Sequence, residues 1–223
     1  MTSVVAVTAV KSLAGAKSRL SAGSAPDGGR PQDVPALVLA MLADTVAAAT
    51  AAGIGPVYVV SPDPTVHAAA ATQGAIGLPE PDGGGLNPAL AAGARTAQRE
   101  HPGAAVLALQ PDLPALTPRE LTAFLTAADH VRAFVPDRQG SGTAALLAPA
   151  GTALDPRFGV DSAARHRASG ALAVEGDWPG LRGDVDTMED LAAAAGMVGS
   201  HTATLLADPL PPTGRSRAVD GPE

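Results

Sequence analysis

The 223-residue sequence contains no cysteine and very few aromatic residues. Without cysteine, the chain cannot form disulfides, zinc–thiolate sites or a thiol nucleophile. Aromatic residues make up 2% of the chain, which argues against stacking platforms for single-stranded nucleic acid. The formal net charge of −7 provides no overall attraction to nucleic acid or to an anionic membrane. We therefore expect no nucleic-acid partner, and any bound anion has to be held by local groups.

The sequence also lacks a secretory signal and a membrane span. The apolar N-terminal stretch has no basic segment in front of it, as a secretory signal would have. The longest apolar stretch, residues 34–54, is interrupted by Asp44 and other polar residues, whereas a span needs about 20 apolar residues. Together with the missing cysteine, these features predict a cytoplasmic protein with no membrane partner.

Short apolar runs alternate with helical segments, which is typical of an α/β fold with a mostly parallel central sheet. A chain of this length suits one domain with a tail, so we assign residues 1–196 to the domain and predict a disordered tail at 197–223. Strands are predicted at residues 4–10, 57–60, 106–109, 131–135, 144–148, 171–174 and 181–187. Helices are predicted at residues 36–52, 63–73, 88–99, 117–128 and 163–167, with a last helix from residue 187.

A carboxylate, Asp112, follows the predicted strand at residues 106–109. In an open α/β sheet, ligands bind beyond the carboxyl ends of the strands, so Asp112 is expected at the mouth of a pocket. The alternative is that Asp112 only opens a turn between Pro111 and Pro114.

Two further carboxylates, Asp184 and Asp186, lie two residues apart. In the predicted strand at residues 181–187 they point to one side while Val185 points to the other, and such a pair is costly without a cation between its members. Alternatively, Asp186 is a helix-start charge that interacts with the macrodipole. Oxygen ligands without Cys or paired His suit a hard cation, so these two residues and Asp112 are candidate Mg²⁺ ligands.

Two loops have the composition of anion-binding or nucleotide-binding segments. Residues 11–20 carry three cations after the first strand, where Lys17 and Arg19 could donate to phosphates; a solvated basic turn explains them equally well. Residues 21–35 are turn-forming and could act as a lid. Residues 77–87 contain three consecutive glycines whose bare backbone could lie against a base or a ribose, and Asn87 could instead be an ordinary helix N-cap.

Gly159 and Ser162 precede a short predicted helix whose N-terminal amides and hydroxyl could bind phosphate. The alternative is an ordinary N-cap at Ser162 or Asp161. His166 on this helix is expected to be a surface or hydrogen-bonded helix residue and not a catalyst.

Gly140, Gly142 and Ala145 fit the spacing of a dinucleotide-binding fingerprint. That fingerprint has to open a long helix, whereas Pro149 and Gly151 end this segment early. We therefore interpret residues 144–148 as a strand.

Together, the strand-end carboxylates, the two glycine-rich loops and the phosphate-binding helix form one consistent site for a nucleoside triphosphate with Mg²⁺. The sequence has no P-loop motif and no Ser-His-Asp set. A second substrate that carries a phosphate needs no general base, because its second pKa of about 6 leaves it largely ionised at neutral pH.

The sequence resembles the guanylyltransferases of coenzyme F-420 biosynthesis, relatives of the MobA-like nucleotidyltransferases, over residues 4–195. The segments that carry the resemblance occur in the same order: LAGAKSRL, GGGLN, PDLPAL, DRQGSGTAALL, RFGVDSAARH and LRGDVDTMEDL. The resemblance implies a Rossmann-like three-layer nucleotidyltransferase fold and transfer of GMP from GTP to a small phosphorylated three-carbon acid. It implies that Asp112, Asp184 and Asp186 bind Mg²⁺ as the catalytic residues and that the acid binds to Thr143, Gly159 and Ser162. We expect the nucleotide at Leu13, Ala14, Lys17, Arg19, Gly84 and Asn87.

The acceptor remains open among phosphoenolpyruvate, 2-phospho-L-lactate and 3-phosphoglycerate, and the GC-rich character of the composition favours phosphoenolpyruvate. A sugar-phosphate or molybdenum-cofactor nucleotidyltransferase is less favoured because of the FGVDS segment. A non-catalytic nucleotide-binding module is the alternative from another class. The sequence leaves the oligomeric state open, with a homodimer among the alternatives.

Overall fold

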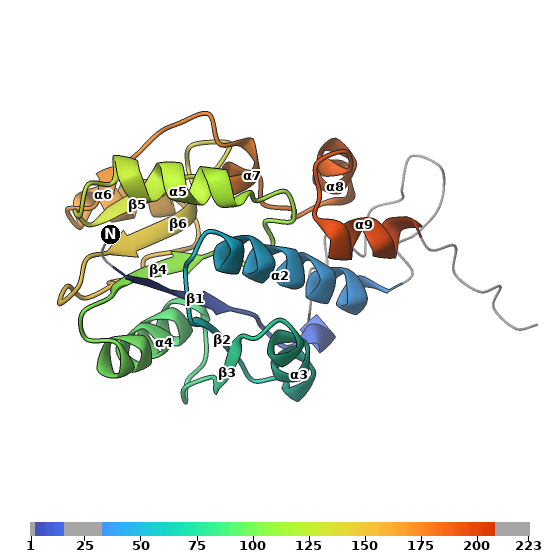
Figure 1. Ribbon diagram of the computed structural model, residues 1–223, viewed down its shortest axis with the longest axis horizontal. Helices are drawn as coiled ribbons and strands as arrows, with labels where there is room; N and C mark the ends of the chain where they lie inside the picture. The colour runs from blue at the N-terminus through green and yellow to red at the C-terminus, as the bar shows by residue number, and fades with distance from the viewer. Residues whose placement is uncertain (1–2, 16–32, 208–223) are drawn as a thin grey trace, which may run out of the picture.

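The computed structural model describes residues 3–15 and 33–207, which fold into one sheet with helices on both faces (Figure 1). The strands are β1 Val4–Ala9, β2 Val57–Ser61, β3 Ile76–Pro79, β4 Ala105–Leu109, β5 Ala133–Pro136, β6 Thr143–Ala148 and β7 Leu172–Ala173. The helices are η1 Leu13–Gly15, α2 Val34–Ala51, α3 Pro64–Thr72, α4 Leu86–Glu100, α5 Pro118–Ala127, α6 Ser162–Ala168, α7 Pro179–Arg182, α8 Met188–Ala194 and α9 Ser200–Ala207.

The sheet has the strand order β3-β2-β1-β4-β6-β5-β7 and is mostly parallel. Among the described strands only β6 is antiparallel, to both β4 and β5. The start of β6 therefore lies at the same edge of the sheet as the ends of β4 and β5. This arrangement confirms the predicted α/β class and brings segments that are distant in sequence to one edge.

Alternate residues of β1, β2, β4, β5 and β6 face two different apolar clusters. Val59 and Leu107 belong to the cluster that contains α2 and α5, and Val60 and Val106 belong to the cluster that contains α4 and α6. In Figure 1, α2 and α5 accordingly lie on one side of the sheet and α4 on the other. Because the strands are buried on both faces, their sequences are continuous apolar runs. The three layers match the predicted fold.

The longest described helix, α2, is apolar on several sides, with Asp44 and Thr45 as its buried polar residues. By length and composition it is the one helix in the described part of the chain that could cross a membrane, but 56% of it is buried inside the protein. It packs between the sheet and α9 (Figure 1). A helix covered on two sides needs apolar residues on both, so its hydrophobicity is that of a core helix.

Helix α9 shows that the prediction of a disordered tail from residue 197 is wrong for residues 200–207. The buried carboxylate of Asp44 accepts hydrogen bonds from the backbone amides of His201 at 3.0 Å and Thr202 at 2.9 Å. These amides lie in the first turn of α9, where helix N–H groups have no partner within the helix. Asp44, which forms this cap, is more than 150 positions away from α9 in the sequence, so the local composition of residues 197–223 could not reveal it. Residues 208–223 lie outside the described part.

Two further predictions of secondary structure are wrong. Residues 181–187 do not form a strand: α7 ends at Arg182, and the chain then runs irregularly to Thr187, which caps α8. Residues 76–79, most of them assigned to the glycine-rich loop, pair with β2 as strand β3. The predicted strand at residues 144–148 is confirmed by β6, which also excludes the dinucleotide fingerprint there.

Candidate active site

A cavity of about 330 Å³ opens where the ends of β4 and β5 meet the start of β6. This volume suits a small ligand. The cavity brings Asp184 together with all three predicted acceptor-binding residues. It is lined by Gln110, Asp137, Ser141, Gly142, Thr143, Gly159, Val160, Asp161, Ser162 and Asp184.

The segment that carries Asp112 is held from both sides. The Thr45 hydroxyl on α2 lies 3.4 Å from the carbonyl oxygen of Pro111 and accepts from the Leu113 amide at 3.2 Å. The carbonyl oxygen of Asp112 itself accepts from the Val185 amide at 3.0 Å. The backbone of Asp112 is thereby tied to the segment that carries Asp184.

The predicted carboxylates lie close enough to influence one another. Burial, together with the neighbouring charges of Asp112 and Asp186, raises the pKa of Asp184 to about 7. A raised pKa caused by burial and like charge is characteristic of functional sites. Within the described ranges, however, no three acidic or histidine side chains are gathered at the spacing of a metal site, so the Mg²⁺ site stays a prediction.

Asp137, which the sequence analysis did not single out, is a fourth acid at this edge. It follows β5 directly; one carboxylate oxygen accepts from the Gly142 amide at 2.9 Å, and the other is buried without a hydrogen-bond partner among the described residues. Its charge also contributes to the raised pKa of Asp184. The strand-end rule that identified Asp112 applies equally to Asp137 and would have found it.

Two arginines fix the acidic segment against the end of β5. Arg182 donates to the carbonyl oxygens of Pro136 at 3.2 Å and Asp137 at 3.0 Å. Arg138 forms an ion pair of 2.7 Å with Asp190, which closes the capping box of α8. The chain between α7 and α8, which includes Asp184 and Asp186, two of the three predicted metal ligands, is therefore anchored at its two ends.

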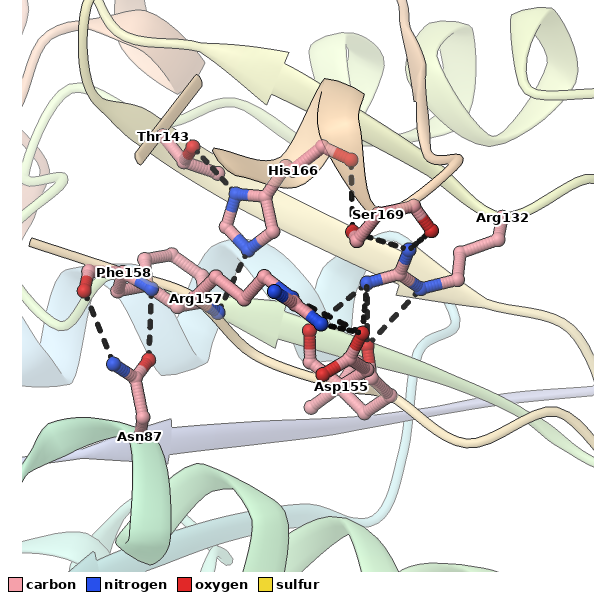
Figure 2. A network of polar contacts seen from close by, with 9 residues as sticks. Asn87, Arg132, Thr143, Asp155, Arg157, Phe158, His166 and Ser169 are labelled. Atoms are coloured by element: carbon pink, nitrogen blue, oxygen red, sulfur yellow. Dashed lines mark hydrogen bonds and ion pairs between the residues drawn. The ribbon is translucent and has the colours of Figure 1, made fainter. Parts of the chain in front are cut away.

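Beside the predicted acceptor site, three buried side chains form a continuous network, and Figure 2 shows the contact between Thr143 and His166. The Ser162 hydroxyl donates to Thr143 Oγ1 at 3.1 Å, and Thr143 Oγ1 lies 2.9 Å from His166 Nδ1. His166 Nε2 accepts from the Arg157 amide at 2.9 Å. Asp161 occupies the N-cap position of α6 without a side-chain cap bond, so neither Asp161 nor Ser162 acts as an ordinary N-cap. His166 is a hydrogen-bonded helix residue, as expected.

The loop before α4, which the sequence predicts to contact the nucleotide, has the open backbone expected of it. Gly83, Gly84 and Gly85 all have positive φ, between 57° and 100°, which favours glycine. Gly85 is the N-cap of α4, so the alternative N-cap role of Asn87 is wrong. The Asn87 side chain instead forms two hydrogen bonds with the backbone of Phe158.

The cationic loop after β1 is only partly described. Leu13 and Ala14 lie in η1, and the Leu13 amide donates to Asp63 at 3.1 Å, which lowers the pKa of that carboxyl group. Lys17 and Arg19 lie outside the described residues. So do residues 21–32 of the segment 21–35 that could act as a lid.

Solved structures with low sequence identity share the whole architecture. A nucleotidyl transferase from Methanothermobacter superposes with a TM-score of 0.57 at 18% identity, over 92% of this chain and 98% of the other. A cytidylyltransferase from Leptospira borgpetersenii gives 0.54 at 12% identity, over 92% and 93% of the two chains. The predicted nucleotidyltransferase fold is therefore confirmed.

Sequence comparisons identify the family. Residues 39–156 match the model described as the MobA-like NTP transferase domain. Proteins named phosphoenolpyruvate guanylyltransferase from Geodermatophilus obscurus, Nocardia farcinica and Salinispora arenicola are 51%, 50% and 48% identical over 93%, 92% and 94% of this chain. The matches cover 96%, 91% and 96% of those relatives. The chain belongs to the phosphoenolpyruvate guanylyltransferase family, within the MobA-like NTP transferases.

Proposed function

We propose that the protein transfers GMP from GTP to phosphoenolpyruvate in coenzyme F-420 biosynthesis, forming enolpyruvoyl-2-diphospho-5′-guanosine. A phosphate oxygen of phosphoenolpyruvate forms a bond to the α-phosphorus of GTP, and the bond from that phosphorus to the β-phosphate oxygen breaks. Pyrophosphate leaves with the electron pair. The observation that carries the proposal is the cavity that Asp184, Thr143 and Ser162 line together, in a chain about half identical to proteins named for this activity.

The acceptor needs positioning and not deprotonation. Its phosphate is largely ionised near neutral pH, and no general base is required of the chain. The cavity wall at Thr143, Gly159 and Ser162 holds the acceptor's anionic end, which aims its oxygen at the nucleotide. The neighbouring Arg165, whose guanidinium donates to Phe158 O at 3.1 Å, adds positive charge beside Gly159.

We propose that Asp112, Asp184 and Asp186 bind Mg²⁺. These residues fit a hard cation because all of the ligand atoms that they offer are carboxylate oxygens. The bound ion would neutralise charge on the phosphates as the transferred group changes partners. The carboxylates would determine the position of the ion. Hydrogen bonds from Arg182 and to the Thr45 hydroxyl hold the backbone segments that carry these carboxylates.

We place the nucleotide against the backbone at Leu13, Ala14 and Gly84. Guanine presents N–H donors at N1 and N2, so backbone carbonyls at residues 13–16 or 82–86 are suited to accept from it. Lys17 and Arg19 are proposed phosphate contacts. Adenine is expected to be a poor substrate, since each unmatched buried polar group costs about 1 to 3 kcal/mol. We also propose a cytoplasmic location, where this cysteine-free chain meets GTP.

The test is magnesium-dependent pyrophosphate release from GTP, or from ATP, with phosphoenolpyruvate, 2-phospho-L-lactate or 3-phosphoglycerate. Release with GTP and phosphoenolpyruvate is expected to be fastest, and a nucleotide-binding module would release none. Asp112→Asn and Asp184→Asn should lower kcat by a factor on the order of 100 or more with the fold retained. Asp129→Asn is the matched control, since this exposed acid follows α5 at the other end of the sheet.

A further inference from the structure

His166 lies directly behind the acceptor cavity and is completely buried. Its ring contacts the rings of Phe134 and Phe158, with centroids 5.5 and 5.2 Å away. Both ring nitrogens are hydrogen-bonded, Nε2 to the Arg157 amide and Nδ1 to Thr143 Oγ1 (Figure 2). The proposed mechanism gives this ring no task.

The two contacts determine which nitrogen carries the proton. A backbone N–H can only donate, so Nε2, which faces the Arg157 amide at 2.9 Å, has to be the unprotonated acceptor. The single hydrogen of the neutral ring is then on Nδ1, which donates to Thr143 Oγ1. The ring is neutral at physiological pH because burial lowers the pKa of His166 to about 4, and the facing charges of Arg132, Arg165 and Arg157 outweigh that of Asp155.

The hydrogen-bond capacity of Thr143 then fixes the direction of its hydroxyl. A threonine oxygen has one hydrogen and accepts two hydrogen bonds. Both acceptor positions of Thr143 are filled, by His166 Nδ1–H and by the Ser162 hydroxyl. Apart from Ser162 Oγ, which donates to it, no described residue is hydrogen-bonded as an acceptor for the Thr143 hydrogen, and Thr143 lines the cavity.

We propose that His166 is a positioning residue that holds Thr143 as a hydrogen-bond donor to the anionic end of the acceptor. This inference rests on the proposed function and extends it to how the acceptor is selected. A hydroxyl that rotates freely can donate or accept, whereas one forced to donate binds an ionised phosphate or carboxylate and disfavours a donor group in its place.

Two variants of His166 separate its two hydrogen bonds. The side-chain nitrogen of His166→Asn can take the place of Nδ1 and donate to Thr143, whereas His166→Gln places its amide near the Nε2 position and leaves Thr143 without this donor. We expect His166→Gln to raise the acceptor KM about tenfold, the effect of losing one oriented hydrogen bond. His166→Asn should stay within about threefold of the original enzyme, and the GTP KM should change in neither variant.

A double-mutant cycle tests whether His166 acts through Thr143. In a Thr143→Val background, His166→Gln should cause no further rise in the acceptor KM. Equal effects of the Asn and Gln variants, a parallel rise in the GTP KM, or full additivity with Thr143→Val would each overturn the proposal.

A measurement independent of turnover keeps the inference separate from the proposed function. Heteronuclear NMR of the imidazole nitrogens in isotope-labelled full-length protein should report protonated Nδ1 and bare Nε2 from about pH 5 to about pH 8. A proton on Nε2 would refute the inference even in an active enzyme. If the expected tautomer is found but no guanylyl transfer occurs, the proposed function fails while the orientation of Thr143 stands.

Discussion

Asn87 and Phe158 exchange two hydrogen bonds across the candidate site (Figure 2). The Asn87 side-chain nitrogen donates to Phe158 O at 3.0 Å, and the Phe158 amide donates to Asn87 Oδ1 at 2.7 Å. Asn87 lies in the first turn of α4, directly after the glycine loop proposed for the nucleotide, and Phe158 precedes Gly159 on the acceptor side. One side-chain amide therefore couples the two halves of the site.

Replacing Asn87 by Asp should disturb both halves. The carboxylate can still accept from the Phe158 amide, but it faces the Phe158 carbonyl oxygen with a second acceptor, and a lost partner of this kind costs about 1 to 3 kcal/mol. We expect the KM values for GTP and for phosphoenolpyruvate to rise together in steady-state kinetics.

The matched control for this prediction is Gln98→Glu on the same helix. Gln98 donates to Thr152 O at 2.7 Å, away from the cavity. Its replacement makes the same chemical change, so it should lower stability and leave both KM values unchanged. Similar KM values for the original enzyme and Asn87→Asp would show that the coupling has no functional effect.

The raised pKa of Asp184 predicts how stability depends on pH in the metal-free protein. The folded state holds this proton up to about pH 7, whereas an unfolded chain releases it near its ordinary value of 3.8. The stabilising contribution is therefore present below the unfolded pKa and is lost as the pH rises to about 7.

Asp184→Asn removes this titration because its side chain is always neutral. With a chelator present, urea unfolding should show the variant gaining stability relative to the original protein between about pH 5 and about pH 8. A difference in unfolding free energy that stays constant over this range would mean that Asp184 does not hold its proton in the folded state.

The features that sequence predicted correctly are local in the chain. The helix predicted at residues 117–128 exists as α5, and its capping box joins Thr117 and Glu120, which lie only three residues apart. Asp112 was found because a strand and the acid after it are adjacent in sequence. Asp184 and Asp186 were singled out by their spacing, but the strand expected there is an irregular segment, and their role as Mg²⁺ ligands stays a prediction.

The features that sequence missed depend on contacts between distant residues. Thr143 and His166 are 23 positions apart, and their hydrogen bond exists only because β6 places its start against α6. A buried histidine between two aromatic rings has no sequence signal of its own, so its role could not be assigned. Asn87 is a residue type that is common at helix N-caps. Only its hydrogen bonds to Phe158, in a separate loop, show that it links two segments of the site instead.

The cap of α9 offers a test of how this helix is held. Asp44→Ala leaves the amides of His201 and Thr202 without their acceptor, and loss of a helix cap costs about 0.5 to 2 kcal/mol. Urea unfolding should show this loss, with phosphoenolpyruvate and GTP KM values unchanged.

His201→Ala is the control for the cap, because it removes a side chain and keeps the backbone amide that Asp44 binds. It should be close to neutral in the same unfolding experiment. An unchanged stability in Asp44→Ala would show that α9 is held by its apolar contacts with α2 alone.

The last prediction concerns Gly159, whose φ of +109° is a conformation that side chains rarely adopt. A Cβ atom there would also lie 3.2 Å from the guanidinium of Arg165, and residues held in such backbone regions cost about 1 to 3 kcal/mol each. Gly159→Ala should therefore shift the loop before Ser162 and raise the phosphoenolpyruvate KM while the GTP KM stays constant.

Gly170→Ala isolates the strain, because Gly170 has φ +84° with no atom within 4 Å of the added carbon and lies after α6, away from the cavity lining. The two variants should lose similar stability, and only Gly159→Ala should lose affinity for the acceptor. If both variants bind phosphoenolpyruvate equally well, the acceptor does not approach the backbone at Gly159.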